Sequence, residues 1–412
     1  MPPRQNPSLA TATAILGDLV AFPTISHDSN LGLAEYVAQR LTEAGAKVVW
    51  DKSPCQTKAN LFATLGAGDQ PTKPASSNGK RRGIVLAGHT DVVPVAGQTW
   101  SRPPFTMHFE NGRLYGRGCC DMKGFLAILL ARLDKLTEAT RQSGVPIYLA
   151  FTYDEEVGCI GAGRLTAMLA KHNIHPRLAI IGEPTEMKVI DGHKGCCHYS
   201  THLSGLAGHG SDPAKGVNAA EYAARYAMRL LEWREKLASK APATSPYLPP
   251  YSTINIGRIS GGAAHNVIAD QARLDWEMRP VAQADLDAVK TDLAEWCAAT
   301  LVPDMQARHP DADIRLEVLA EAPSLGQTKN NTARDIMLEV TGENSSGVAA
   351  YCTEAGVFQE AGMECVVCGP GSINQAHKAD EYIEVSQLQL GLATLDKIAD
   401  RIDHIASGVV GK

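Results

Sequence analysis

The 412-residue sequence has no hydrophobic run long enough to cross a membrane. Its longest largely apolar stretch, residues 124–133, is far shorter than the roughly 20 residues that a membrane-spanning helix needs. Basic residues are not in excess either, because 39 lysines and arginines face 45 acidic residues without any basic block. A signal peptide is not expected, since Asp18 interrupts the apolar amino-terminal stretch. We therefore expect a cytoplasmic protein with no membrane span and no nucleic-acid partner.

Cysteine is too sparse for a disulfide framework. The ten cysteines are a small share of the chain, and two pairs are adjacent in sequence, at 119–120 and 196–197, so free thiols are expected. A chain of this length buries a sizeable core without disulfides. The one CxxC, Cys365 to Cys368, lies in an apolar run without a second CxxC. This context favours packing in a core over a zinc or redox site.

Short apolar runs rich in β-branched residues alternate with helical segments in the first half of the chain. The runs that predict strands are 47–50, 60–65, 83–89, 146–156 and 178–185. Helices are predicted between them at 123–136 and 162–172, after an amino-terminal helical stretch. Continuous apolar strands that alternate with helices indicate an α/β fold. We expect a doubly wound, mostly parallel sheet with helices on both faces.

The middle of the chain has a different pattern, in which two amphipathic helices separate half-buried strands. The order strand, helix, strand, strand, helix, strand predicts a ferredoxin-like α+β domain. Helices and strands alternate again after it, so the tail is expected to complete the first sheet. We therefore predict an inserted domain at 192–321 within a catalytic domain formed by 1–191 and 322–412. Polar stretches at 66–83 and 240–252 predict surface loops.

Polar side chains that can perform chemistry follow four of the predicted strands. Because ligands bind at the carboxyl ends of strands in open α/β sheets, these side chains are expected at one edge of the sheet. Asp121, in the turn before a helix, can join them. The residues that follow the strands are His89, Asp91, Glu155, Glu156, Glu183 and His377.

This set of residues indicates a metal site. Two histidines with several carboxylates are the ligands of a hydrolytic centre with nitrogen and oxygen donors. The adjacent carboxylates of Glu155 and Glu156 would repel each other unless cations compensate their charge, and the chemistry needs one to bind metal and one to move protons. Helix capping is the alternative for any single Asp or Glu, but it does not explain the whole set.

Five motifs together resemble the M20 family of dinuclear zinc amidohydrolases and peptidases. They occur in the family's order and extend from about Val20 to the carboxyl terminus. One departure is the cysteine pair before Asp121, where other small residues are usual, but the aspartate itself is present. The motifs are HTD at 89–91, GRGCCDMKG at 116–124, DEEVG at 154–158, GEPT at 182–185 and GPGSINQAH at 369–377.

The resemblance implies a role for each matching residue of the centre. His89 and Glu183 would bind one Zn²⁺, Glu156 and His377 the other, and Asp121 would bridge both. Asp91 would hold the imidazole of His89, and Glu155 would be the general base. Co²⁺ and Mn²⁺ share such ligands, so the residues leave the metal open.

The resemblance also implies substrate contacts and a homodimer. His209, in the inserted domain, would reach the active site of a partner subunit and stabilise the oxyanion. The other substrate contacts would be Asn266, Arg279, Glu354 and Asn374. On charge alone, Arg279 is the candidate for a substrate carboxylate and Glu354 for an ammonium group.

Several motifs are similar to the branch of the family that hydrolyses N-acetylornithine in arginine biosynthesis, among them YCTEA at 351–355. The implied substrate is thus a small N-acyl amino acid. Three alternatives are weighed against it. An aminoacylase, dipeptidase or desuccinylase would keep the same centre. A nucleotide-binding protein would need a GxGxxG spacing that the sequence lacks. A non-catalytic relative would be expected to lose a ligand or Glu155, and all are present.

Overall fold

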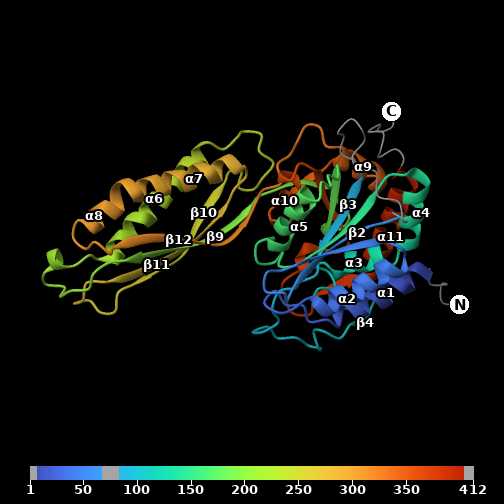
Figure 1. The fold of residues 1–412 in the computed structure, drawn as a ribbon, viewed down its shortest axis with the longest axis horizontal. Helices are drawn as coiled ribbons and strands as arrows, with labels where there is room; N and C mark the ends of the chain where they lie inside the picture. The colour runs from blue at the N-terminus through green and yellow to red at the C-terminus, as the bar shows by residue number, and fades with distance from the viewer. Residues whose placement is uncertain (1–6, 67–82, 403–412) are drawn as a thin grey trace. The chain divides into compact units, whose positions relative to one another are not determined.

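The computed structural model describes residues 7–66 and 83–402, and Figure 1 shows its fold. The loop predicted at 66–83 lies almost wholly outside the described residues. Within the described part of the chain, no helix combines the length and the apolar character that crossing a membrane would need.

The chain divides into two compact units, each described here by itself. The large unit comprises the residues up to Gly192, with Gln327–Gly347 and the residues from Thr353 onward. The small unit comprises His193–Gly326 and Val348–Cys352. Compared with the predicted insertion at 192–321, the small unit also contains the returning residues up to 326 and a separate short segment.

An eight-stranded sheet lies mainly in the large unit, in the order β1-β2-β6-β3-β7-β14-β8-β13. Its neighbouring strands β6, β3, β7 and β14 run parallel, which confirms the predicted α/β class. These four strands are fully buried apart from Glu364, in agreement with their continuous apolar sequences. The strands are β1 (Lys47–Lys52), β2 (Ala59–Thr64), β3 (Ile84–His89), β6 (Ile147–Thr152), β7 (Leu178–Pro184), β8 (Ile190–His193), β13 (Gly347–Ala349) and β14 (Glu364–Gly369).

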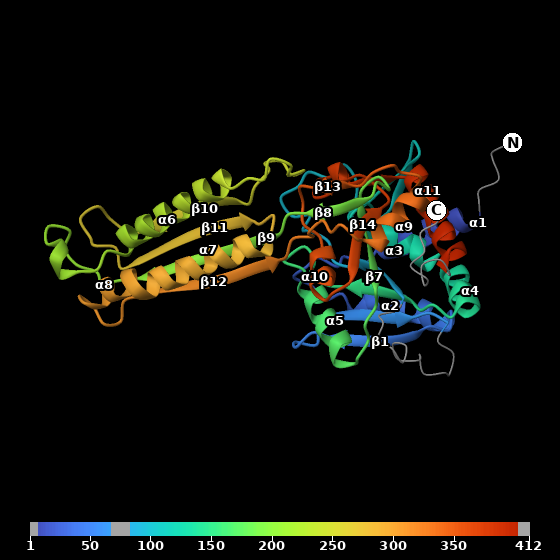
Figure 2. The same cartoon turned by 90° about the horizontal axis from the view of Figure 1, so that it is seen from above.

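Helices cover both faces of this sheet (Figure 1 and Figure 2). On one face α5 and α10 contact each other, and the other helices enclose the main hydrophobic core on the opposite face. Cys365 and Cys368 are buried in β14, so the predicted packing role of the CxxC is confirmed. The helices are α1 (Pro7–Val20), α2 (Leu31–Glu43), α3 (Lys123–Leu130), α4 (Leu133–Ser143), α5 (Ile160–Lys171), α9 (Thr332–Thr341), α10 (Ala355–Glu360) and α11 (Val385–Asp400).

Two local features differ from the sequence analysis. The helix predicted at 123–136 is broken into α3 and α4 at Ala131 and Arg132, and the Arg132 side chain turns to bond Asp396 on α11 at 2.9 Å. A three-stranded sheet of very short strands, in the order β15-β5-β4, was not predicted. Its strands are β4 (His108–Glu110), β5 (Arg113–Tyr115) and β15 (Tyr382–Glu384).

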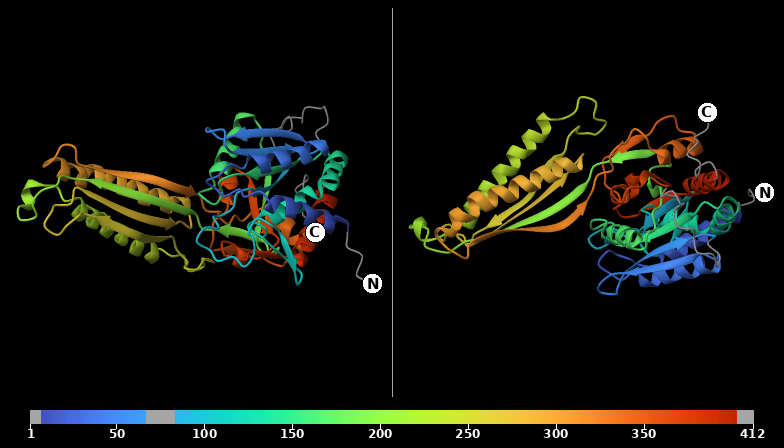
Figure 3. Two further views of the ribbon diagram at one scale, coloured as in Figure 1. Left: turned by 90° about the horizontal axis from the view of Figure 1, so that it is seen from below. Right: turned by 45° about the horizontal axis from the view of Figure 1, so that its top comes forward.

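The small unit contains a four-stranded antiparallel sheet in the order β10-β11-β9-β12. This order and the chain path β9, α6, β10, β11, α7, β12 are those of a ferredoxin-like fold, as predicted. Helices α6 and α7 cover one face of the sheet (Figure 3). The elements are β9 (Cys196–Ser204), α6 (Ala219–Ser239), β10 (Thr253–Gly261), β11 (Gln271–Arg279), α7 (Gln283–Trp296), α8 (Val302–Gln306) and β12 (Asp313–Ala322).

The two ends of the main segment of the small unit are paired. The backbone N–H of His193 donates to the carbonyl of Leu325 at 3.1 Å, and the N–H of Leu325 donates to the carbonyl of His193 at 3.0 Å. The chain therefore leaves and returns to the large unit through neighbouring residues.

Candidate metal centre

The predicted ligands all lie in the large unit, near the carboxyl ends of the parallel strands. His89 is the last residue of β3, Glu183 lies near the end of β7, and Glu156 follows β6. Asp121 precedes α3, and His377 follows the 3₁₀ turn after β14. Since the four strands are parallel, the residues that follow them reach the same edge of the sheet.

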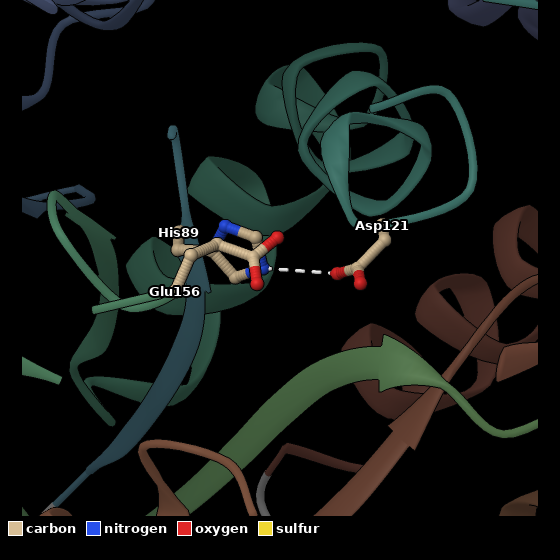
Figure 4. Close-up of side chains that lie close together, drawn as sticks. All are labelled: His89, Asp121 and Glu156. Atoms are coloured by element: carbon tan, nitrogen blue, oxygen red, sulfur yellow. Dashed lines mark hydrogen bonds and ion pairs between the residues drawn. The ribbon is translucent and has the colours of Figure 1, made fainter. Parts of the chain in front are cut away.

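The carboxylate of Asp121 lies between the two histidines. Its Oδ1 is 3.0 Å from Nε2 of His89, and its Oδ2 is 3.4 Å from Nε2 of His377. Nε2 of His377 is also 3.0 Å from Glu156, and Nε2 of His89 is 3.6 Å from Glu183. Figure 4 shows His89, Asp121 and Glu156 together, with the bond between His89 and Asp121 dashed.

Two overlapping groups of side chains could hold a cation in the described part of the chain. One is His89, Asp121 and Glu156, and the other is His89, Glu155 and Glu183. In each group the ligand atoms lie within 4.8 Å of one another. Nitrogen and carboxylate oxygen donors at this spacing fit a divalent metal ion.

The electrostatics of the cluster also fit a cation. Burial raises the pKa of Glu183 well above its usual value, and the charge of Asp121 adds to this effect. Hydrogen bonds that His377 donates to Asp121 and Glu156 raise its pKa to about 10. The imidazoles therefore compensate part of the negative charge of the carboxylates. A divalent cation would supply that charge instead and would bind neutral imidazole.

Asp91 contacts His89 through its backbone. Nδ1 of His89 donates to the carbonyl of Asp91 at 2.9 Å, whereas the Asp91 carboxylate is 3.7 Å away. This bond keeps Nε2 unprotonated in the neutral imidazole, as a metal ligand requires. The backbone of Asp91 thus makes the closer contact with His89, and the role predicted for its carboxylate stays a prediction.

The Asp91 carboxylate instead holds the segment after β6. It accepts the backbone N–H of Glu155 at 3.1 Å and that of Glu156 at 3.3 Å, and the hydroxyl of Ser26 at 2.8 Å. Asp91 thus positions both adjacent glutamates. Ser26 was not predicted, because it lies 65 positions before Asp91 and carries no local signal.

Glu155 is partly accessible to solvent. It is half-buried, as is Glu156, whereas His89, Asp121 and Glu183 are buried and His377 is exposed. One carboxylate oxygen of Glu155 accepts the thiol of Cys159 at 3.4 Å. A carboxylate beside the ligands that still meets solvent can exchange protons with water or a substrate.

Two of the predicted substrate contacts lie in the large unit. Asn374 is exposed, in the 3₁₀ turn three residues before His377. Glu354 has no exposed surface, and it accepts the hydroxyl of Thr152 at 2.7 Å. Its other oxygen is buried without a hydrogen-bond partner, and burial raises its pKa to about 7. A substrate ammonium could reach Glu354 only after a rearrangement.

The other three predicted contacts lie in the small unit. Nδ1 of His209 accepts the backbone N–H of Ser211 at 3.2 Å and lies 2.7 Å from the Ser211 hydroxyl, so the neutral ring carries its proton on Nε2. Arg279 pairs with Glu277 at 3.2 Å. Asn266 is exposed, and its carbonyl accepts the N–H of Gly210 at 2.8 Å. Ser211 lies only two residues after His209, so the sequence could have indicated it as a partner of the His209 side chain.

Comparisons with known proteins agree with the fold and the cluster. Residues 85–401 match the model of peptidase family M20/M25/M40. Acetylornithine deacetylase from Proteus mirabilis is 35% identical over 93% of this chain and 95% of its own length. The same enzyme from Shigella sonnei is 33% identical over 89% and 91%.

Solved structures share the fold at low identity. The M20 family metallo-carboxypeptidase Sso-CP2 from Sulfolobus solfataricus has a TM-score of 0.68 at 17% identity, over 96% of this chain and 99% of its own. Aminopeptidase PepT from Bacillus cereus has a TM-score of 0.67 at 18% identity, over 96% and 98%. The resemblance drawn from the motifs is thus confirmed: the chain belongs to peptidase family M20/M25/M40 and is a metal-dependent hydrolase.

Proposed function

We propose that the chain hydrolyses the amide of N2-acetyl-L-ornithine to L-ornithine and acetate, a step of arginine biosynthesis. The observation that carries the proposal is the Asp121 carboxylate, with one oxygen toward each of two histidines. The substrate is inferred from relatives at 33–35% identity that align over most of the chain.

The residues that would hold two cations form two pairs, and Asp121 would be a ligand common to both. His89 and Glu183 would bind one and Glu156 and His377 the other, with Asp121 shared. Zn²⁺ is the proposed metal, and Co²⁺ or Mn²⁺ would suit the same donors. When bound, the cations would polarise the amide carbonyl and lower the pKa of water.

Glu155 is the proposed general base. It would accept a proton from the attacking water and pass it to the departing α-nitrogen of ornithine. Two observations support this role: the half-buried Glu155 side chain, and the backbone bond from its N–H to Asp91. The bond limits the movement of the residue relative to the ligands.

His209 is proposed to stabilise the oxyanion that develops on the acetyl group. Its neutral ring offers an Nε2–H donor, because Nδ1 is already an acceptor for Ser211. We further propose a homodimer through the small unit, in which His209 serves the active site of the partner subunit. The edge strands β10 and β12 leave two sheet edges for such an association.

A second candidate is an aminoacylase, dipeptidase or desuccinylase with the same centre. It is favoured by the burial of Glu354, which leaves no exposed acid at that position for the ornithine ammonium. A panel of N-acetylated, N-succinylated and dipeptide substrates would separate the candidates.

The test is acetate release from N2-acetyl-L-ornithine. Metal-stripped protein should be inactive and should recover on addition of one and then two equivalents of Zn²⁺ per chain. Efficient turnover of N-acetylornithine, at least tenfold above every other substrate of the panel in kcat/KM, is expected. A preference for a dipeptide or a succinylated substrate would replace the proposed substrate with the second candidate.

A further inference from the structure

Glu381 is a buried carboxylate whose two oxygens are both occupied by donors from the loop that carries Asp121. Its Oε1 accepts the backbone N–H groups of Cys120 at 2.9 Å and Asp121 at 3.1 Å. Its Oε2 accepts the N–H of Gly118 at 3.0 Å and Nη1 of Arg117 at 2.7 Å. The side chain of Glu381 is only 1% exposed, so its hydrogen bonds come from these protein donors and not from bulk solvent.

The loop depends on these bonds for its shape. The backbone carbonyl of Glu381 also accepts the N–H of Gly116 at 3.0 Å, so one residue binds both ends of 116–121. Gly118 has a φ of 80°, a left-handed conformation that favours glycine. The bonds to Glu381 thus set the backbone at Asp121, on which the direction of its carboxylate depends.

Arg117 extends the same contacts to the loop of His377. Nη1 of Arg117 also donates to the carbonyl of Lys378 at 3.3 Å, and Nη2 donates to the side chain of Gln98. Gln98 in turn donates to the carbonyl of His377 at 2.9 Å. His377 has a φ of 63°, which a residue other than glycine adopts only when its surroundings hold it there.

We propose that Glu381 is a positioning residue, which orients Asp121 between His89 and His377 and so sets the affinity and geometry of the metal centre. The inference rests on the proposed role of Asp121 as the shared ligand. Glu381 itself touches neither the ligand side chains nor a reacting atom by any of the bonds described above.

The chemistry of the donors explains why a carboxylate is needed. Three backbone N–H groups and a guanidinium all donate, and only a carboxylate offers acceptors on both of its ends. Glutamine has nearly the same shape, but its NH₂ group would face two of the donors. Glu381→Gln therefore tests the interaction with little change in volume.

The experiment measures Co²⁺ binding to metal-stripped protein, by visible absorption and by competition with a chelator. We expect Glu381→Gln to bind Co²⁺ about 10- to 100-fold more weakly in at least one of the two binding events, the range typical for residues that support metal ligands. Its absorption spectrum at saturating Co²⁺ should also differ from that of the wild type. A role in folding alone would lower stability without changing the spectrum at saturation.

Glu384→Gln is the matched control, since Glu384 lies on β15 in the same part of the chain. It forms an exposed pair with Arg113 at 3.5 Å, with half of its side chain accessible. Its Co²⁺ affinity and spectrum should equal those of the wild type. Glu381→Asp, which keeps both acceptor oxygens but shortens their reach, should fall between the wild type and Glu381→Gln.

If Glu381→Gln does not fold, Glu381→Asp and Arg117→Lys provide the same comparison, and each should bind Co²⁺ more weakly than the wild type. Folded variants with wild-type affinity and spectrum would overturn the proposal. Because no substrate is used, a wild-type protein that binds two Co²⁺ but leaves N-acetylornithine intact would refute the proposed substrate alone.

Discussion

The imidazole of His89 bonds to the backbone carbonyl of Asp91 at 2.9 Å, and the carboxylate of the same residue lies 3.7 Å away. A backbone carbonyl cannot be removed by substitution and does not titrate. The closest contact of His89 Nδ1 therefore comes from the backbone at position 91, and the carboxylate bonds the backbone of Glu155 and Glu156.

The first prediction separates these two functions of Asp91. Asp91→Asn should retain the metal content of the wild type, because the bond to His89 comes from the backbone. Its kcat should fall about 10- to 100-fold, because an amide cannot accept both N–H groups and the Ser26 hydroxyl together. Elemental analysis and steady-state kinetics on the same sample provide the check. Loss of a metal equivalent would show that the carboxylate acts on His89 after all.

The second prediction concerns the two adjacent glutamates. Glu155→Gln should keep both metals and lose about 10²- to 10⁴-fold in turnover, the range for general acid–base catalysis. Glu156→Gln is its matched control, and it should lose metal from one site. Wild-type turnover of Glu155→Gln at full metal content would remove Glu155 from the role of base.

The third prediction tests whether active sites are shared between subunits. Glu155→Ala and His209→Ala should each be inactive alone, and mixing them under conditions of subunit exchange should restore activity. A heterodimer then has one site with both defects and one with neither, so it should approach half of the wild-type activity.

Two controls accompany this mixing experiment. Exchange has to be verified independently, for example with differently tagged chains and mass spectrometry. No recovery despite verified exchange, or full activity of His209→Ala alone, would exclude catalysis by His209 of the partner subunit.

The fourth prediction concerns pH and Glu354. Burial raises the pKa of Glu354 from 4.5 to about 7 in the folded protein, so between these values the folded state binds more protons than the unfolded state. The free energy of unfolding should therefore fall as pH rises from about 4.5 to 7 and then level off, by at most about 3 kcal/mol from this group.

Glu354→Gln should remove this dependence while it keeps an acceptor for Thr152. Urea unfolding of wild type and variant in metal-free form at pH 5, 6, 7 and 8 measures the difference. The free energy of unfolding of the variant should increase relative to that of the wild type as pH rises to 7. Glu360→Gln, an exposed change in the helix that begins directly after Glu354, should follow the wild type. Parallel curves for wild type and Glu354→Gln would contradict the assignment.

The order of the main strands and helices could be predicted because it depends on local patterns. Buried parallel strands such as β3 and β7 are continuous apolar runs, and those patterns need no knowledge of the rest of the chain. The three-stranded sheet could not be predicted, because its strands have only three residues each. In addition, β15 pairs with β5 from a distant segment, where Arg113 lies over Tyr382 at 4.3 Å.

The ligand types at the ends of strands could likewise be proposed from sequence, because parallel strands bring their ends together. The hydrogen-bond donors to each carboxylate could not be predicted from the sequence. Glu381 and Gly118 are 263 positions apart, and only the folded backbone brings that carboxylate to the loop. In the same way, no pattern distinguishes the carbonyl of Asp91 from its side chain as the partner of His89.

The pairing of His193 with Leu325 has a consequence for how such a chain could evolve. A segment whose two ends are already joined by a pair of backbone bonds can be removed or exchanged by closing a short turn, and short closures cost little chain entropy. Gene rearrangements at this one position could therefore replace the main segment of the small unit while leaving every ligand of the metal centre in place. The metal centre and the small unit, which is proposed to contact the substrate and to form the dimer, can thus change at different rates in evolution.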